Sequence, residues 1–246
     1  PVGCGKVVEI KEGPYAGLWG TSPEYETLSG FGGNLLIDDL PAIVALNLRC
    51  NDLGLDTIST SGVVAFATEA MERGLLSPED AGGLRLEWGK PEPVLTLVER
   101  IAQRQGLGDL LADGVRAAAA RLGPEAETFA VHVKGLESAY HDPRAFVDMG
   151  LNYATAGRGA CHLESLSYWR GYGVEWPGWL EGPHDRFASD EGAVRLVITF
   201  QNFMAVYNPL GLCKFMIRGW LTPARTVELV EAALGWDWSV EDLMRI

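Results

Sequence analysis

Short series of apolar residues at helical spacing, each closed by a glycine, constrain the fold of this chain most strongly. After Asp38-Asp39 and Pro41, apolar side chains recur every three or four positions as far as Gly54. An acidic N-cap, a proline in the first turn and a terminal glycine are typical of a complete helix. The same pattern predicts further helices over 61–73, 93–105 and 109–122, which end at Gly74, Gly106 and Gly123.

The second half of the chain is less regular. Residues 131–178 are rich in glycine, tyrosine, arginine and tryptophan and show little periodicity, which predicts loops and short helices around a site. An apolar run over 193–207 follows, and a helix is predicted over 223–234. The Ser239-x-x-Asp242 capping box predicts one more helix start.

Strand signals are scarce in this sequence. Only the opening, 7–10, has an extended pattern, while the glycines and prolines of 13–17 and 20–26 indicate loops. We therefore predict a mainly α fold with few or no strands. The change from regular to irregular patterning predicts two helical domains, 1–134 and 135–246.

Length and charge narrow the class of protein. A chain of 246 residues can bury a sizeable core without disulfides. Acidic residues outnumber basic ones by 33 to 20, a net charge of −13, so nucleic acids and anionic membrane surfaces are repelled on average. No segment approaches the roughly 18 apolar residues of a membrane span, and the start lacks a signal-peptide pattern. We expect a cytoplasmic protein that binds neither nucleic acid nor membrane.

Four cysteines are spread along the chain, at Cys4, Cys50, Cys161 and Cys213. Their wide spacing and the absence of a C-x-x-C pair do not favour disulfides, and an isolated cysteine is most often a small buried apolar residue. The glycines of 30–33 are weakly similar to a phosphate-binding loop. They lack the preceding strand and the G-K-[ST] sequence that such a loop requires.

Two short motifs have the same form, N-x-L-G-L followed by Asp or Cys. One spans 51–56 and the other 208–213, and each follows a predicted helix. A polar side chain and exposed backbone groups therefore meet at a glycine-enabled turn. Two similar helix C-caps are the alternative interpretation of this repetition.

Six ordered segments resemble the aldehyde ferredoxin oxidoreductase family, whose members carry tungsten, two pterins and a [4Fe-4S] cluster. The segments are Pro-Glu-Tyr-Glu-Thr (23–27), Cys-Asn-Asp-Leu-Gly-Leu-Asp-Thr-Ile-Ser (50–59), Val-Lys-Gly-Leu-Glu (133–137), Asp-Pro-Arg (142–144), Arg-Gly-Ala-Cys-His-Leu (158–163) and Leu-Gly-Leu-Cys-Lys-Phe (210–215). The resemblance runs over essentially the whole chain. It implies the family's helical second and third domains, and it implies that an N-terminal domain of the same protein is missing before Pro1.

The resemblance implies cofactor-binding roles for both motifs. Pterin contacts fall on Asn51, Leu55 and Asp56 in the first motif, on Asn208, Leu212 and Cys213 in the second, and on Arg158. The family usually has Asp where this chain has Asn51 and Asn208, so the acceptor oxygen is retained and the charge is lost. The implied cofactor is a tungsten or molybdenum bis-pterin, with allowance for magnesium bridging the pterin phosphates.

The resemblance also implies a [4Fe-4S] cluster with cysteine ligands. Pro1-Val-Gly-Cys4 is similar to the end of the family's C-x-x-C-x-x-x-C motif, and Cys213 matches the fourth, distant cysteine. Cys4 and Cys213 are then metal ligands, and the other two ligands precede Pro1. This chain alone is expected not to hold a normal cluster and to be inactive.

Glu26 and His162 match the positions where the family places a carboxylate and an imidazole beside the metal. A carboxylate in a dry pocket is suited to accept a proton from water, and a histidine can donate to a carbonyl oxygen. Tyr25 is the candidate for orienting the substrate. The implied reaction is oxidation of an aldehyde to a carboxylic acid, with electrons leaving through the cluster to ferredoxin or another electron-transfer protein.

Two alternatives stay open at this point. The protein could act on aromatic acyl-CoA esters or hydroxycarboxylates, or it could be a non-catalytic electron-transfer or scaffold subunit. A homodimer is also compatible with the resemblance. His132, His141 and His184 have no shared metal-ligand spacing and are expected to be structural or on the surface. The eight tryptophans, among them Trp169, Trp176 and Trp179, are expected to pack in the core or at an interface in preference to lining a substrate pocket.

Overall fold

The computed structural model describes residues 5–245. It contains two compact units, one ending at Tyr140 and the other beginning at His141. Each unit is described by itself below. The division predicted between residues 134 and 135 stays a prediction about the domains.

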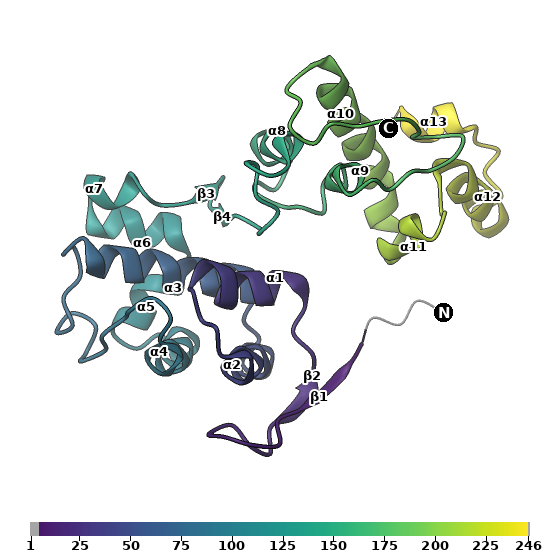
Figure 1. Ribbon diagram of the computed structural model, residues 1–246. Helices are drawn as coiled ribbons and strands as arrows, with labels where there is room; N and C mark the ends of the chain where they lie inside the picture. Colours follow the sequence, from purple (N-terminus) through teal and green to yellow (C-terminus); the bar gives the residue numbers. More distant parts are fainter. Residues whose placement is uncertain (1–4, 246) are drawn as a thin grey trace. The chain divides into compact units, whose positions relative to one another are not determined.

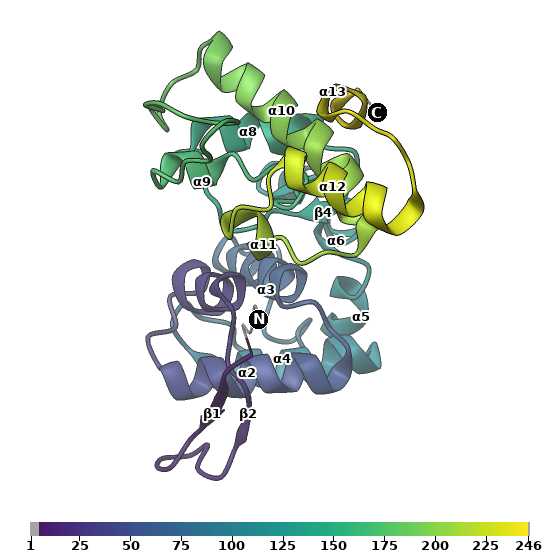
Figure 2. The same ribbon diagram turned by 90° about the vertical axis from the view of Figure 1, so that its right-hand side faces the viewer.

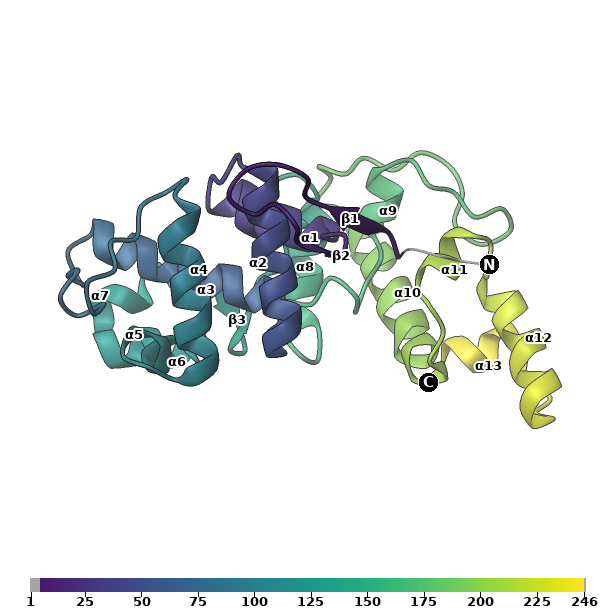
Figure 3. The same ribbon diagram turned by 90° about the horizontal axis from the view of Figure 1, so that it is seen from below.

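The first unit is built mainly from helices. Its elements in chain order are β1 (Val7–Glu9), β2 (Trp19–Thr21), α1 (Tyr25–Thr27), the π-helix η1 (Leu28–Asn34), α2 (Leu40–Leu53), α3 (Thr57–Glu72), α4 (Pro91–Gln103), α5 (Leu107–Leu111), α6 (Val115–Leu122), α7 (Pro124–Glu127), β3 (His132–Val133) and β4 (Leu136–Glu137). Helices α2 and α4 lie side by side and are seen end-on in Figure 1 and lengthwise in Figure 3. Helix α3 contacts both of them, and also η1, α5 and α6.

The ends of α2 confirm the sequence prediction. Asp39 caps the helix by accepting a hydrogen bond from the Ala42 N–H at 3.2 Å, and Gly54 closes it in the left-handed region at φ 69°. Helix α3, however, begins at Thr57, four residues before the predicted start. Asp56 accepts the Ser59 N–H at 2.8 Å and caps it there, so the acidic residue of the first motif is also a helix N-cap.

The prediction of a single helix over 109–122 is wrong. Two helices, α5 and α6, replace it, and the chain turns between them at Gly114 with φ 88° and ψ 169°. Only glycine adopts this backbone conformation readily. The buried Glu137 carboxylate accepts the Val115 N–H at 2.6 Å and so caps α6 from a distant part of the chain. Periodicity along the helix could not reveal that partner.

A hairpin at the N-terminal side of this unit corrects part of the loop prediction. Strands β1 and β2 pair antiparallel, with Val7 opposite Thr21 and Glu9 opposite Trp19. Figure 2 shows the hairpin extending away from α2. Residues 19–21 are therefore paired strand, whereas the turn over 13–17 is a loop as predicted. The glycine-rich segment 30–33 lies within η1, not in a phosphate-binding loop.

The core of the first unit fills the space between α2, α3, α4 and the short helices. Its fully buried members include Leu46, Val64, Leu97 and Ala118. Cys50 belongs to the same cluster and is fully buried, and burial raises the pKa of its thiol to about 12. The expectation that an isolated cysteine packs as an apolar residue is confirmed at this position.

The second unit is also helical. It contains α8 (Val147–Thr155), α9 (Tyr168–Gly171), α10 (Glu191–Tyr207), the 3-10 helix η2 (Asn208–Leu210), α11 (Phe215–Arg218), α12 (Pro223–Leu234) and α13 (Val240–Met244). Helix α10 contacts α8, η2 and α13, and α12 contacts α13. Asp190 caps α10 by accepting the Ala193 N–H at 3.0 Å. The predicted capping box is present at Ser239 and Asp242.

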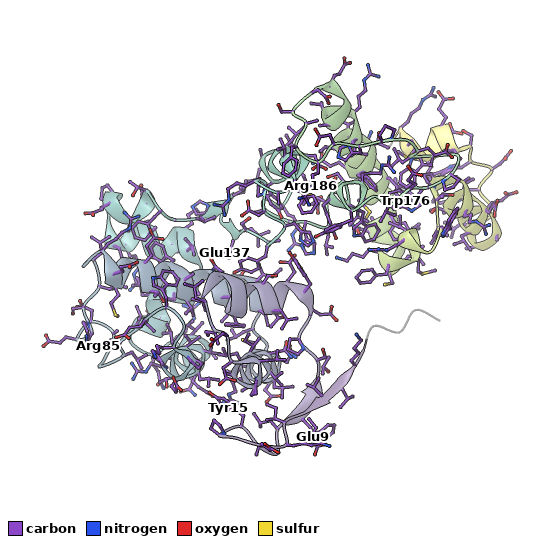
Figure 4. All side chains as sticks on the ribbon, in the orientation of Figure 1. Glu9, Tyr15, Arg85, Glu137, Trp176 and Arg186 are labelled. Atoms are coloured by element: carbon purple, nitrogen blue, oxygen red, sulfur yellow. The ribbon has the colours of Figure 1, made fainter. Side chains whose placement is uncertain are left out.

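Aromatic side chains form much of the second core. Trp176 is fully buried and donates its Nε1–H to the Ile217 carbonyl at 2.7 Å. Trp169, Trp179 and Phe200 have ring centroids 6.1 Å or less from that of Trp176. Figure 4 labels Trp176 among the side chains of the second unit. Core packing is therefore confirmed for Trp169 and Trp176, whereas Trp179 is half-buried and Trp19, Trp220 and Trp236 are exposed.

The fold class is confirmed as mainly α, since the strands of the described chain form only two small antiparallel pairs. None of the helices within 5–245 has the length and apolar character needed to cross a bilayer. Cys50, Cys161 and Cys213 are all free thiols. The expectation of no disulfide therefore holds for these three cysteines.

Gly114→Ala should destabilise the first unit. The added Cβ would lie 2.8 Å from the Glu137 Oε1 atom, in a backbone conformation that alanine rarely adopts. We expect the free energy of unfolding in urea to fall by roughly 1–3 kcal/mol. Gly157→Ala is the matched control, because a Cβ there meets open space without a positive φ. Equal stability of the two variants would contradict this account of the α5–α6 turn.

Candidate functional site

Glu26 is a buried carboxylate in the short helix α1. Its side chain is only 9% exposed. The Oε2 atom accepts a hydrogen bond from the backbone N–H of Tyr140 at 2.7 Å, across 114 residues of sequence. The structure thus gives the candidate catalytic carboxylate a defined position inside the first unit.

Tyr25 and Tyr140 form the other half of this contact. The Tyr25 hydroxyl donates to the Tyr140 carbonyl at 3.2 Å, although the Tyr25 side chain is itself half-exposed. The two neighbours in α1 therefore engage both main-chain polar groups of one residue. This arrangement brings the two sequence-predicted residues Tyr25 and Glu26 together at Tyr140, a residue that the sequence analysis did not select.

The Tyr140 phenol is anchored in turn on α3 and η1. Its hydroxyl lies 2.7 Å from Ser61 Oγ and accepts from Asn34 Nδ2 at 3.4 Å. Burial raises the pKa of Tyr140 to about 12, and the nearby charges of Glu26 and Asp56 act in the same direction. The phenol therefore stays protonated and can donate at neutral pH.

The N-x-L-G-L motifs over 51–56 and 208–213 are the first and second Gly-Leu motifs. The first lies where α2 ends and α3 begins. The Gly54 N–H bonds to the Asn51 carbonyl at 3.2 Å and the Leu55 N–H to the Cys50 carbonyl at 2.8 Å. Asn51 and Asp56 are exposed, and Leu55 is half-buried. A hydroxyl pair, Thr27 with Thr57 at 2.8 Å, joins α1 to the first turn of α3. The motif and Glu26 are thus carried by adjoining segments of the first unit.

The second Gly-Leu motif repeats the turn of the first. Its Gly211 has φ 68°, against 69° at Gly54, and the Gly211 N–H bonds to the Asn208 carbonyl at 3.1 Å. Asn208 and Cys213 are exposed, while Leu212 is half-buried. The Tyr207 hydroxyl donates to the Cys213 carbonyl at 2.9 Å, and burial raises the pKa of Tyr207 to about 12.

His162 lies in a loop of the second unit and is buried, with 8% of its surface exposed. Its Nε2 atom is 3.2 Å from the Lys214 Nζ atom. An ammonium group can only donate, so with Lys214 charged the imidazole accepts at Nε2 and carries its proton on Nδ1. Because Lys214 follows Cys213 directly, this contact places His162 beside the second motif.

His141 is a buried residue of this region that the sequence analysis did not single out. Its ring stacks on that of His162, with ring centroids 4.9 Å apart and an angle of 10° between the planes. The centroid of the Tyr168 ring lies 3.9 Å from that of His141. The stack joins residues 21 positions apart, and the buried ring is compatible with the structural role expected for His141. His132 accepts the Gly135 N–H at 3.3 Å, and His184 is half-buried.

One predicted residue of the described chain is not brought into these contacts. Arg158 is exposed in the loop that follows α8. Cys4 lies outside the described residues, so its predicted role as a cluster ligand stays a prediction.

The side chains present fit the cofactors that the sequence implies. Both motif asparagines are exposed at left-handed turns, and neither side-chain amide bonds to another residue in the described part of the chain. A pterin edge is rich in N–H donors that such acceptor oxygens can bind. Cys213 offers an exposed free thiol, the soft ligand that an iron–sulfur cluster requires.

The comparison with known proteins gives a match along the entire chain. Residues 1–246 match the family described as "Aldehyde ferredoxin oxidoreductase, domains 2 & 3". The tungsten-containing aldehyde ferredoxin oxidoreductase of Thermococcus kodakarensis is 39% identical over 248 aligned residues, which cover 100% of this chain and 39% of the relative. The WOR-like subunit of an aliphatic sulfonate oxidoreductase from Pyrococcus furiosus is 35% identical over 68% of this chain and 28% of its own length.

A solved structure has a similar fold. The active site complex BamBC of benzoyl coenzyme A reductase, in complex with 1,5-dienoyl-CoA, matches with a TM-score of 0.72 at 21% identity. The match covers 100% of this chain and 41% of that one. This chain therefore spans 39% of the length of the tungsten-containing relative, and it belongs to the aldehyde ferredoxin oxidoreductase family, of which it represents domains 2 and 3.

Proposed function

We propose that the protein containing this chain is an aldehyde oxidoreductase with a tungsten or molybdenum bis-pterin cofactor. The reaction converts an aldehyde and water into a carboxylic acid, two protons and two electrons. The observation that carries the proposal is the buried Glu26 carboxylate, fixed by the Tyr140 N–H on a segment joined to the first Gly-Leu motif. The family membership supports the same reaction type.

Each predicted side chain has a distinct task in this proposal. Glu26 accepts the proton released as water adds to the aldehyde, because a buried carboxylate with one oxygen bonded to an amide is held in an acceptor role. His162, with its proton on Nδ1, is the candidate donor to the carbonyl oxygen. Tyr25 orients the substrate from the exposed end of the same segment.

The cofactors would be held by the two motifs. Asn51, Asp56 and Asn208 offer oxygen acceptors to the pterins, and Arg158 offers a charge. The bound metal supplies the acceptor for the electron pair. Cys213, together with Cys4 and two cysteines from the remainder of the protein, would bind the [4Fe-4S] cluster that passes electrons to ferredoxin.

Glu26→Gln should abolish aldehyde oxidation while leaving the tungsten content unchanged. The amide keeps the size of the side chain but cannot accept the proton, and we expect at least a 100-fold fall in kcat, on the order of what a general base contributes. The assay is viologen reduction by the full-length holoenzyme. Glu24→Gln is the control, because Glu24 is exposed and makes no side-chain cap hydrogen bond. Normal turnover by Glu26→Gln would remove Glu26 from the mechanism.

Elemental analysis tests the cofactor assignment. The full-length protein purified without oxygen should contain about one tungsten or molybdenum and about four irons per chain. Iron alone would favour an electron-transfer subunit over an oxidoreductase with a pterin site.

A substrate screen then identifies the substrate class. Aldehydes, acyl-CoA esters, hydroxycarboxylates and sulfonates are each tested for a colour change of a viologen dye.

Alkylation of thiols tests Cys213 as a cluster ligand. In iron-free full-length protein at pH 8, iodoacetamide should modify the exposed Cys213 and leave Cys50 intact. With a pKa of about 12, the Cys50 thiolate fraction at pH 8 is only about one in ten thousand. Reconstitution with iron and sulfide should then protect Cys213, as measured by mass spectrometry of the labelled peptides. Equal labelling before and after reconstitution would exclude Cys213 from the cluster.

A further inference from the structure

Tyr140 connects the candidate carboxylate to the scaffold of the first unit through its main chain and its side chain. Its N–H donates to Glu26 Oε2 at 2.7 Å and its carbonyl accepts from Tyr25 at 3.2 Å. The residue lies just beyond β4, in a segment without regular structure. No strand or helix therefore fixes the direction of its N–H, and another interaction has to do so.

The Tyr140 phenol supplies that interaction through a series of hydrogen bonds with Ser61 and Asn34. The Ser61 hydroxyl can donate to the Thr57 carbonyl at 2.7 Å or to the Ile58 carbonyl at 3.0 Å within α3. Ser61 then accepts from the Tyr140 hydroxyl at 2.7 Å. The Tyr140 oxygen in turn accepts from Asn34. Every hydroxyl in the series donates once, so the series is internally consistent.

Gly30 makes this series possible. A Cβ at residue 30 would lie 2.2 Å from Ser61 Oγ and 2.8 Å from Tyr140 Cε2, far inside contact distance. Glycine therefore lets η1 approach α3 closely enough to confine the phenol between them. Glu26 and Gly30 are four residues apart in continuous helical backbone. The carboxylate and the glycine that contacts the Tyr140 ring therefore belong to one helical segment.

We propose that Tyr140 is a positioning residue, whose phenol, held by Ser61 against Gly30, fixes the backbone N–H of residue 140 on the Glu26 carboxylate. The proposal rests on the role of Glu26 in the proposed function. An amide N–H cannot accept a hydrogen bond, so the bonded oxygen stays an acceptor. The carboxylate is thereby held in a single orientation, and a misplacement of about 1 Å at a reacting group can cost on the order of 100-fold in rate.

Amide hydrogen exchange at residue 140 tests the contact without relying on catalysis. In the full-length holoenzyme, Tyr140→Phe and Ser61→Ala each remove one hydroxyl from the series. We expect exchange of the residue-140 amide to be faster by about tenfold or more in both, since a local opening becomes easier. Glu26→Ala, which removes the acceptor, should have the same effect.

Thr68→Val is the matched control for Ser61→Ala. Thr68 is a buried hydroxyl on the same helix, and it bonds only within α3, to the Val64 carbonyl at 2.8 Å. Its substitution should leave exchange at residue 140 unchanged. Melting temperature and tungsten content of all variants, measured alongside, identify any general loss of structure or cofactor.

Kinetics test whether the contact positions the carboxylate for the reaction. Tyr140→Phe and Ser61→Ala should lower kcat about tenfold with KM changed by less than about twofold, whereas Thr68→Val should match the wild type. Unchanged exchange at residue 140, or faster exchange with unchanged kcat, would overturn the positioning role. Glu26→Gln separates the two hypotheses: full activity in that variant contradicts the proposed function, whereas an inactive Glu26→Gln with a fully active Tyr140→Phe contradicts only the positioning role.

Discussion

The site of the first unit depends on the close approach of Gly30 to Ser61. Without a Cβ at residue 30, η1 packs directly on α3, and the Tyr140 ring occupies the remaining space. The contact bears on Glu26 in two ways: α1 and η1 are continuous, and Tyr140 returns from a distant part of the chain to donate its N–H to the carboxylate. A π-helix at this point fits the observation that such segments are frequent at functional sites.

The two Gly-Leu motifs share one backbone turn. In each, a helix has ended, the glycine takes the left-handed conformation, and its N–H returns to the asparagine carbonyl three residues earlier. The backbone of the turn is satisfied internally, so the asparagine side chain does not have to stabilise it. A glycine in the left-handed conformation is a common way to end a helix, and both turns leave the asparagine side chain exposed.

The sequence was informative wherever one local signal determines the structure. The predicted caps Asp39 and Ser239 set the starts of α2 and α13. It was misleading where a partner lies far away along the chain. The break at Gly114 depends on Glu137, and β2 depends on β1; in both cases the local residues alone favour a different structure. The division into two domains after residue 134 stays a prediction.

The same distinction explains how the candidate site residues could be found. Glu26, His162 and Cys213 lie in a three-residue helix and in loops, where hydrophobic periodicity carries no information. Only the resemblance to family segments identifies these three residues. Tyr140 and His141 lie outside the six family segments, although His141 directly precedes one of them, and their contacts with Glu26 and His162 span long stretches of sequence. Reactive groups at helix ends and in loops have unpaired backbone donors and acceptors nearby, which regular helices lack in their interiors. Such positions therefore suit the proposed function, in which the site binds a cofactor and directs a proton.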